Sequence, residues 1–190
     1  MTINDYDMIS RADIYNLYAG DTVYVHADKD VSILVGSDFT TFSGFLIEPV
    51  HGEVRAWSVA RTYGWQDSHA LYPVPFDKVL VNHGGDWNTL GHFYTCPLDG
   101  VYYLTVNVAA QAGRRVDVSL RVNGIKRASV SSSSTNRGGI HPYNRSIILY
   151  LTKGSTVALQ AEKNTAIHST TEQLTSFSGF LLYSGTIPEM

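Results

Sequence analysis

The chain has 190 residues, of which 44% are apolar and 16% are charged, and its net charge is −3. This composition suits a globular protein with a hydrophobic core, and the charge gives no reason to expect nucleic acid or an anionic membrane as partner. The single cysteine excludes an intramolecular disulfide and a cysteine-based metal site, and no stretch is long and apolar enough for a transmembrane span.

The first quarter of the chain repeats its end. Residues 10–47 align with residues 144–182, and Gly154 follows its counterpart Gly20 by 134 residues. A later loop contains one inserted residue, which is how related domains usually differ. The repeat predicts the following organisation: a C-terminal remnant of an upstream domain with its last strands at 1–47, a linker at 48–53, a complete domain at 54–185 and a tail at 186–190.

The remnant at 1–47 needs a partner, because a fragment of this length is too small to bury an adequate core alone. Either the rest of its domain lies upstream, or the segment pairs with the sheet edge of a neighbouring chain. The first residues lack a basic region followed by an apolar run and so do not form a signal peptide. An upstream part could carry that signal, and we therefore still expect a secreted, extracellular protein.

From residue 54 onward, apolar and polar residues alternate with the period of β-strands. Residues 101–108 and 116–122 follow this pattern, and Asn123–Gly124 then supplies a favoured hairpin turn. Residues 146–151 and 156–162 are predicted as another strand pair. No segment has helical spacing, so we expect an all-β sandwich or jelly roll of eight to ten strands.

The last predicted strand carries large apolar groups on both of its faces. A sandwich strand needs only one such face for its own core. The second face is covered either by another element of the same domain or by another subunit. Gly179 within the strand indicates that a neighbouring side chain or backbone lies close. The two faces contain the following residues: Phe177, Gly179, Leu181 and Tyr183 on one, and Ser178, Phe180 and Leu182 on the other.

Six blocks of sequence occur in order at regular spacing: AWSVAR (56–61), VPFDKVLVNHGGDWN (74–88), GHFYTCPLDGVYYL (91–104), RVNG (121–124), LYLTKGSTV (149–157) and SFSGFLLY (176–183). Together they resemble the globular head domain of complement C1q, in the C1q/TNF-like family. The resemblance covers 54–184 as a complete copy and 10–47 as the last third of a preceding copy. It implies a ten-stranded jelly-roll sandwich that forms a homotrimer and is usually extracellular.

The resemblance also implies which residues serve the fold. Three positions depart from the family pattern, Trp57, Trp87 and Leu104, but each remains large and apolar. A trimer would cover the second apolar face of the last strand. The chain contains no Gly-X-Y run. The implied fold and packing positions are Phe76, Asn82, Asn88, Gly91, Phe93, Pro97, Gly100, Tyr102, Gly154, Phe177, Gly179 and Phe180.

Catalytic motifs are absent from the sequence: it contains neither HExxH, nor G-x-S-x-G, nor a Walker loop. Cys96 precedes Pro97 and is expected to be a buried, inert thiol. We therefore expect that the protein is not an enzyme. Some family members bind calcium, and Asp86 and Asp117 are weak candidate ligands, with solvated carboxylates as the alternative. No other cofactor is expected.

Two loops have the composition of a recognition surface, with rigid aromatics beside adaptable polar groups. One contains Tyr63, Trp65 and Tyr72, and the other contains Arg137 and His141. The alternative is that both are variable, solvated loops. The sequence thus predicts a trimeric, non-enzymatic recognition protein of innate immunity that binds microbial glycans or other surface ligands. The alternative function is a signalling ligand, of the cerebellin or adipokine type, that engages a receptor protein.

Overall fold

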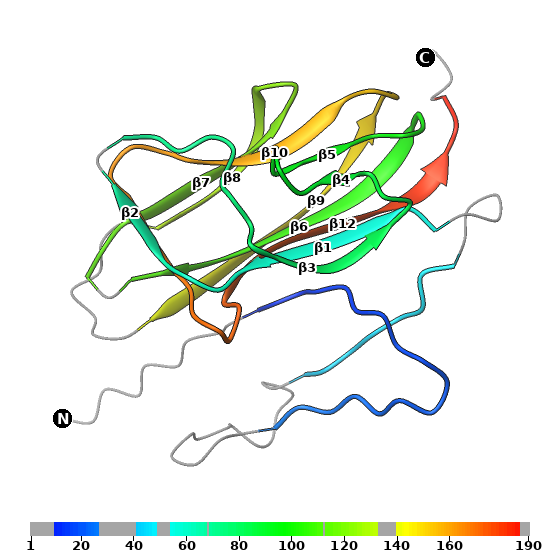
Figure 1. The fold of residues 1–190 in the computed structure, drawn as a ribbon, viewed down its shortest axis with the longest axis horizontal. Helices are drawn as coiled ribbons and strands as arrows, with labels where there is room; N and C mark the ends of the chain where they lie inside the picture. Colours follow the sequence, from blue (N-terminus) through cyan, green and yellow to red (C-terminus); the bar gives the residue numbers. More distant parts are fainter. Residues whose placement is uncertain are drawn as a thin grey trace.

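The computed structural model describes residues 10–26, 41–48, 54–67, 69–111, 113–132 and 140–186. Most of the expected linker, the end of the expected tail, and Arg137 lie outside these ranges. The described residues form strands and no helix (Figure 1). The strands are β1 Ala56–Arg61, β2 Trp65–Asp67, β3 Lys78–His83, β4 Trp87–Asn88, β5 Phe93–Thr95, β6 Gly100–Ala110, β7 Val116–Val122, β8 Ile125–Ser132, β9 His141–Leu151, β10 Thr156–Ala161, β11 Thr165–His168 and β12 Thr175–Ser184.

These strands form two antiparallel sheets that pack face to face. The larger sheet has the order β2-β11-β6-β12-β1-β3, with β9 paired to the other edge of β6, and the smaller sheet has the order β4-β5-β10-β7-β8. The all-β sandwich expected from the alternating sequence pattern is therefore present. The described part of the chain has twelve strands rather than ten, and four of them (β2, β4, β5 and β11) contain only two to four residues. Such short pairings are not visible as an alternating pattern.

The hairpin predicted around Asn123–Gly124 is confirmed. Val122 pairs with Ile125, so the loop between β7 and β8 has two residues. Both loop residues have positive φ, 51° for Asn123 and 77° for Gly124. Positive φ at both central positions is the conformation that Asn-Gly favours and that matches the twist of the flanking strands.

The predicted pairing of the next two strands is wrong. β9 pairs with β6 in the larger sheet, whereas β10 pairs with β5 and β7 in the smaller one. The turn at Gly154, where φ is 82°, therefore crosses from one sheet to the other. Alternation predicts that both strands exist but does not specify their partners, because each strand has an apolar face that can join the same core from either sheet.

The core between the sheets is rich in aromatic rings. Trp57 of β1 packs edge to face against Phe177 of β12, with ring centroids 5.5 Å apart. Gly179 lies beneath the same indole: a Cβ placed there would lie 2.6 Å from Trp57 Cζ2 and 2.8 Å from Leu104 Cδ2. Both contacts come from neighbouring side chains pressed onto the strand, as a glycine within a strand predicts.

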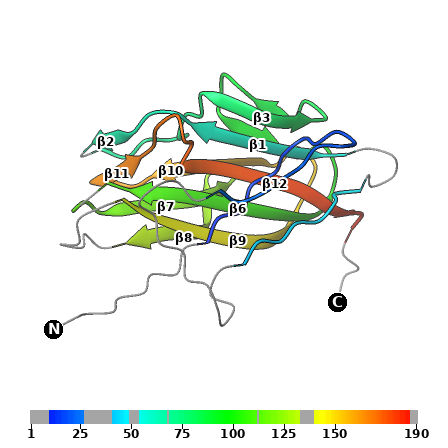
Figure 2. The same ribbon diagram turned by 90° about the horizontal axis from the view of Figure 1, so that it is seen from below.

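The outer face of the larger sheet is covered by the N-terminal part of the same chain. Figure 2 shows residues 10–26 running across β12 and β1. Ile14 and Ile47 pack against the cluster of Ala56, Val81 and Phe180. Phe45 makes a ring contact with Phe180 at 5.9 Å between centroids. Both faces of β12 are thus buried, and in the structure the cover on the second face comes from this chain.

Candidate functional site

The described ligand candidates lie at one end of the sandwich. A single row of paired residues crosses four strands: Trp65 of β2 pairs with Ile167, Ile167 with Ala110, and Ala110 with His141 of β9. Directly paired residues share a face. Three strand spacings separate Trp65 from His141 by about 14 Å. Trp65 and His141, one residue from each predicted recognition loop, therefore lie at the same end of the larger sheet (Figure 1).

The tyrosines of this end are accessible. Tyr63 is 47% exposed in the connection between β1 and β2, and Tyr72 is 46% exposed just before a cis bond to Pro73. The backbone of the preceding Leu71 forms a bridge with Ala161, which holds the Tyr72 loop against the end of β10. These half-exposed rings on fixed backbone are suited to contact a ligand with little loss of side-chain entropy.

Trp65 and His141 are less accessible than the tyrosines. Trp65 is partly buried and packs against the main core cluster. His141 is also partly buried, and its Nε2 atom is buried without a hydrogen-bond partner in the structure. Of the predicted ligand residues that the structure describes, Tyr63 and Tyr72 thus present the most surface.

Arg61 is a further residue of this end, one that the sequence reasoning did not select. Its side chain is fully buried, donates from Nε to the Tyr63 carbonyl at 3.3 Å, and donates from Nη1 to the Pro75 carbonyl. The guanidinium carbon also lies 4.4 Å from the centre of the Tyr63 ring, a cation–π distance. Arg61 therefore holds both the backbone and the ring of Tyr63.

The position of Arg61 has consequences for its charge. Burial lowers the pKa of Arg61, and the nearby Tyr63 and Asp77 partly oppose this. Its Nη2 atom is buried without a partner in the structure. The signal in the sequence was the pattern of AWSVAR, which places an arginine on the same face as Trp57 and Val59. A charged residue on a core-facing position is usually paired or functional.

The two calcium candidates lie at opposite ends of β10. Thr95, which pairs with the first residue of β10, donates its N–H to the carbonyl of Asp86, while Glu162, just after β10, donates to the carbonyl of Asp117. Six strand residues separate these ends by about 20 Å. One calcium ion, with ligands at about 2.3–2.6 Å, cannot bind both carboxylates.

Each of the two aspartates has a cationic neighbour. Asp86 forms an ion pair with Arg55, 3.3 Å apart, and Asp117 forms one with Arg115. Within the described ranges, no group of three or more His, Cys, Asp or Glu side chains is arranged to hold a metal ion. The same residues include no helix long and apolar enough to cross a membrane.

The residues implied as fold positions make local packing and turn contacts. The amide of Asn82 clamps Trp87 by accepting its N–H at 3.0 Å and donating to its carbonyl at 3.3 Å. Asn88 accepts the N–H groups of Leu90 and Gly91 at 3.0 and 2.7 Å, which closes the loop before β5. The buried Tyr102 hydroxyl donates to the Leu98 carbonyl at 2.9 Å.

These contacts lie within two antiparallel sheets that pack face to face, which defines an all-β sandwich domain. The chain belongs to the C1q domain family, since residues 56–182 match the C1q domain. The resemblance stated from six sequence blocks is therefore confirmed for the complete domain.

Curated relatives agree with this assignment. The chain is 35% identical over 120 residues to human complement C1q and tumor necrosis factor-related protein 9A, covering 59% of this chain and 34% of that protein. It is 31% identical over 132 residues to mouse complement C1q tumor necrosis factor-related protein 2, covering 68% of this chain and 43% of that protein. The chain thus matches less than half the length of either relative.

Solved structures share the fold. The globular domain of zebrafish complement 1qA superposes with a TM-score of 0.56 at 21% identity, covering 69% of this chain and 99% of that domain. Murine APRIL superposes with a TM-score of 0.55 at 12% identity, covering 68% of this chain and all of that one. At these identities the likeness shows the fold alone.

Proposed function

We propose that this protein is a secreted, non-enzymatic recognition protein of innate immunity that binds microbial glycans or other surface ligands. The proposed binding surface is the end of the C1q domain that carries Tyr63, Tyr72 and His141, which we name the loop end. The observation that carries the proposal is the pair of half-exposed tyrosines, Tyr63 and Tyr72, at this end of the sandwich. Tyr63 is held from below by the buried Arg61. Rigid aromatic anchors of this kind dominate many recognition surfaces.

The proposed assembly is a homotrimer, formed through the outer face of the larger sheet. That face carries buried apolar residues that the core between the sheets does not use, Ala56, Val81 and Phe180. Three copies would place three loop ends together, and linked weak sites bind more tightly than one. Light scattering on the full chain over a wide concentration range should show the mass rising from one chain to three. A mass that stays at one chain throughout would contradict this assembly.

Binding of the full chain to a glycan array tests the ligand. We expect binding that free sugar inhibits, and a loss of about tenfold or more in affinity for Tyr63→Ala and Tyr72→Ala, as for other hot-spot aromatics. Tyr183→Ala is the matched control, because Tyr183 is 69% exposed but lies near the C-terminal end of β12, at the other end of the sheet. Equal losses for all three variants would contradict a site at the loop end.

A second function, a signalling ligand that engages a receptor protein, is favoured by a separate observation. The curated relatives named above are C1q and tumor necrosis factor-related proteins, and they match this chain over its C1q domain. A silent glycan array together with saturable binding to a membrane protein on cells would favour this second function. The same tyrosine variants and the same control apply, since both functions place the ligand on the loop end.

A further inference from the structure

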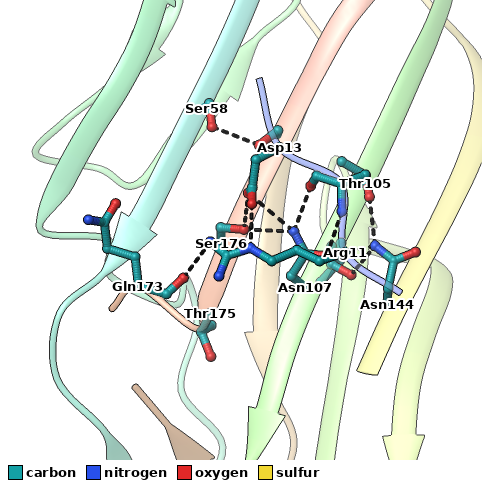
Figure 3. Close-up of polar contacts among 12 residues, drawn as sticks. Arg11, Asp13, Ser58, Thr105, Asn107, Asn144, Gln173, Thr175 and Ser176 are labelled. Carbon is teal, nitrogen blue, oxygen red and sulfur yellow. Dashed lines mark hydrogen bonds and ion pairs between the residues drawn. The ribbon is translucent and has the colours of Figure 1, made fainter. Parts of the chain in front are cut away.

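The outer face of the larger sheet holds the N-terminal segment by a built polar clamp. The Asn107 side chain of β6 donates from Nδ2 to the Ala12 carbonyl at 2.7 Å, and its Oδ1 atom accepts the Ala12 N–H at 3.4 Å (Figure 3). A single amide thus contacts both main-chain polar groups of Ala12. We name residues 11–16 the strap. A clamp of this kind binds extended backbone in one register.

The strap also inserts an acid into the sheet face. The Asp13 side chain is only 5% exposed, and its Oδ1 atom accepts a hydrogen bond from the Ser176 hydroxyl at 2.6 Å. Arg11 forms an ion pair with Asp13 and donates from Nη2 to the Gln173 carbonyl at 2.8 Å. The charge of Asp13 is therefore compensated in its buried position, as a buried carboxylate requires.

The polar side chains under the strap, Asn107, Ser176 and Asn144, form a hydrogen-bonded row that the strap covers. Asn107 also donates to Ser176 at 2.7 Å and accepts from Asn144 at 2.7 Å. Asn107 and Ser176 are both buried in the structure, although they point away from the core between the sheets. Without the strap these groups would face solvent or another protein surface.

Apolar contacts and one further hydrogen bond extend the docking site along the same face. Ile14 of the strap packs into the cluster around Phe180. At the end of the strap, the amide oxygen of Asn16 lies 2.7 Å from Nε2 of His83 on β3. The strap therefore crosses from β6 to β3 over the surface on which the proposed trimer depends.

The docking is held by side chains rather than by sheet pairing. In the part of the chain that the structure describes, no main-chain to main-chain hydrogen bond joins residues 10–18 to a strand. Lifting the strap therefore breaks its hydrogen bonds to Asn107, Ser176 and His83 and the contact of Ile14 with the cluster around Phe180. Every strand ladder of the sandwich stays intact. Such side-chain contacts can be exchanged without unfolding the domain.

We propose that residues 11–16 act as an autoinhibitory strap, docked on the outer face of the larger sheet, and that subunits associate through this face only when the strap is displaced. The inference rests on the trimer proposed above and deepens it by naming its regulation. Because strap and neighbouring subunit compete for the same face, weakening the strap strengthens assembly. The occupant of the face in the closed state is this chain's own segment.

The test uses the full chain with changes confined to the strap, so that the sheet face stays intact. Asp13→Ala removes the acceptor of the Ser176 hydroxyl, and Ile14→Ser removes the apolar contact of the strap with the cluster around Phe180. Each variant should lower the concentration of half-maximal trimer formation, measured by light scattering, by about tenfold for Asp13→Ala. Trypsin should also cleave after Arg11 several-fold faster in Ile14→Ser.

Asp21→Ala is the control, because the Asp21 carboxylate accepts the Tyr18 N–H at 2.8 Å within a turn that lies outside the strap. It should leave both readouts unchanged. If the wild-type protein forms trimers and the strap variants are cleaved faster but assemble at the same concentration as wild type, the strap inference is overturned and the trimer stands. Absence of trimers in wild type and in all variants would overturn the trimer and the inference together. Circular dichroism confirms that each variant is folded.

Discussion

The indole ring of Trp57 lies stacked on the phenol ring of Tyr94, with ring centroids 3.8 Å apart and planes inclined by 16°. Trp57 belongs to β1 of the larger sheet and Tyr94 to β5 of the smaller one, so this contact joins the two layers. Both side chains are fully buried. The large Trp57 ring is accommodated because Gly179 beneath it has no side chain.

This arrangement predicts that Gly179→Ala destabilises the domain. The new methyl group would overlap the Trp57 ring, which cannot move away because Tyr94 and Phe177 pack against it. Overpacking of this kind costs about 1–3 kcal/mol in the free energy of unfolding. Urea denaturation of the full chain measures it. Gly44→Ala is the control, since a Cβ at Gly44 meets no atom within 4 Å, and equal stability of both variants would contradict the prediction.

The alternating sequence pattern predicted strands best where a strand buries only one of its two faces. The alternation in 116–122 and the Asn123–Gly124 pair predicted the β7–β8 hairpin because strand period and turn conformation are local properties. Alternation in β6 indicated a half-buried strand, yet Thr105 and Asn107 are buried as well. Asn107 is covered by Ala12 of the strap, 95 residues earlier in the chain, and Thr105 accepts hydrogen bonds from Asn144 and Ser146 of β9. An alternating pattern within one strand cannot predict contacts with residues so far away in the sequence.

The sequence predicted the aromatic residues of the candidate site but not Arg61, the buried residue that holds Tyr63. Exposed Tyr63 and Tyr72 follow from loop composition, whereas the role of Arg61 depends on the fold of the loop that returns to Pro75. Likewise, Asp86 and Asp117 were plausible calcium ligands until the topology placed them at the two ends of β10. Distances between side chains on different strands require the strand order, which composition does not provide.

Arg61→Lys is expected to loosen the loop end. A lysine keeps the charge but loses the planar fork that donates to the Tyr63 and Pro75 carbonyls, and it cannot lie flat on the Tyr63 ring. We expect a loss of about 2 kcal/mol in the free energy of unfolding, measured by urea denaturation. Arg127→Lys, on an exposed position of β8, should have no measurable effect. Equal midpoints for the two variants would contradict a structural role of Arg61.

His92 is expected to make stability dependent on pH between 7 and 5. Burial, with a smaller effect of Arg61, lowers the pKa of His92 below the usual 6.5. In the unfolded chain His92 therefore takes up a proton at a higher pH than in the folded one. Its contribution to stability is complete above pH 6.5 and is lost as the pH falls through the folded pKa.

The variant His92→Asn tests this pH dependence. Nδ1 of His92 accepts the N–H of Phe76 at 3.4 Å, and His92 has a φ of 54°, a conformation that Asn tolerates. Urea denaturation at pH 7, 6 and 5 should show a smaller decline in the free energy of unfolding for the variant than for wild type. Between pH 8 and 7 the two proteins should change in parallel. An identical decline from pH 7 to 5 would show that His92 does not cause it.

Cys96 is expected to resist alkylation in the folded protein. Burial, together with the nearby Asp86, raises the pKa of its thiol to about 12, and the side chain is 1% exposed. At pH 8 the thiolate, which is the reactive form, is then about 10³-fold scarcer than for a free cysteine. Mass spectrometry after treatment with iodoacetamide should show unmodified native protein and complete modification in denaturant, which serves as the control. Modification of the native protein within minutes would mean that the region around β5 opens frequently, because only an opened state exposes this thiolate.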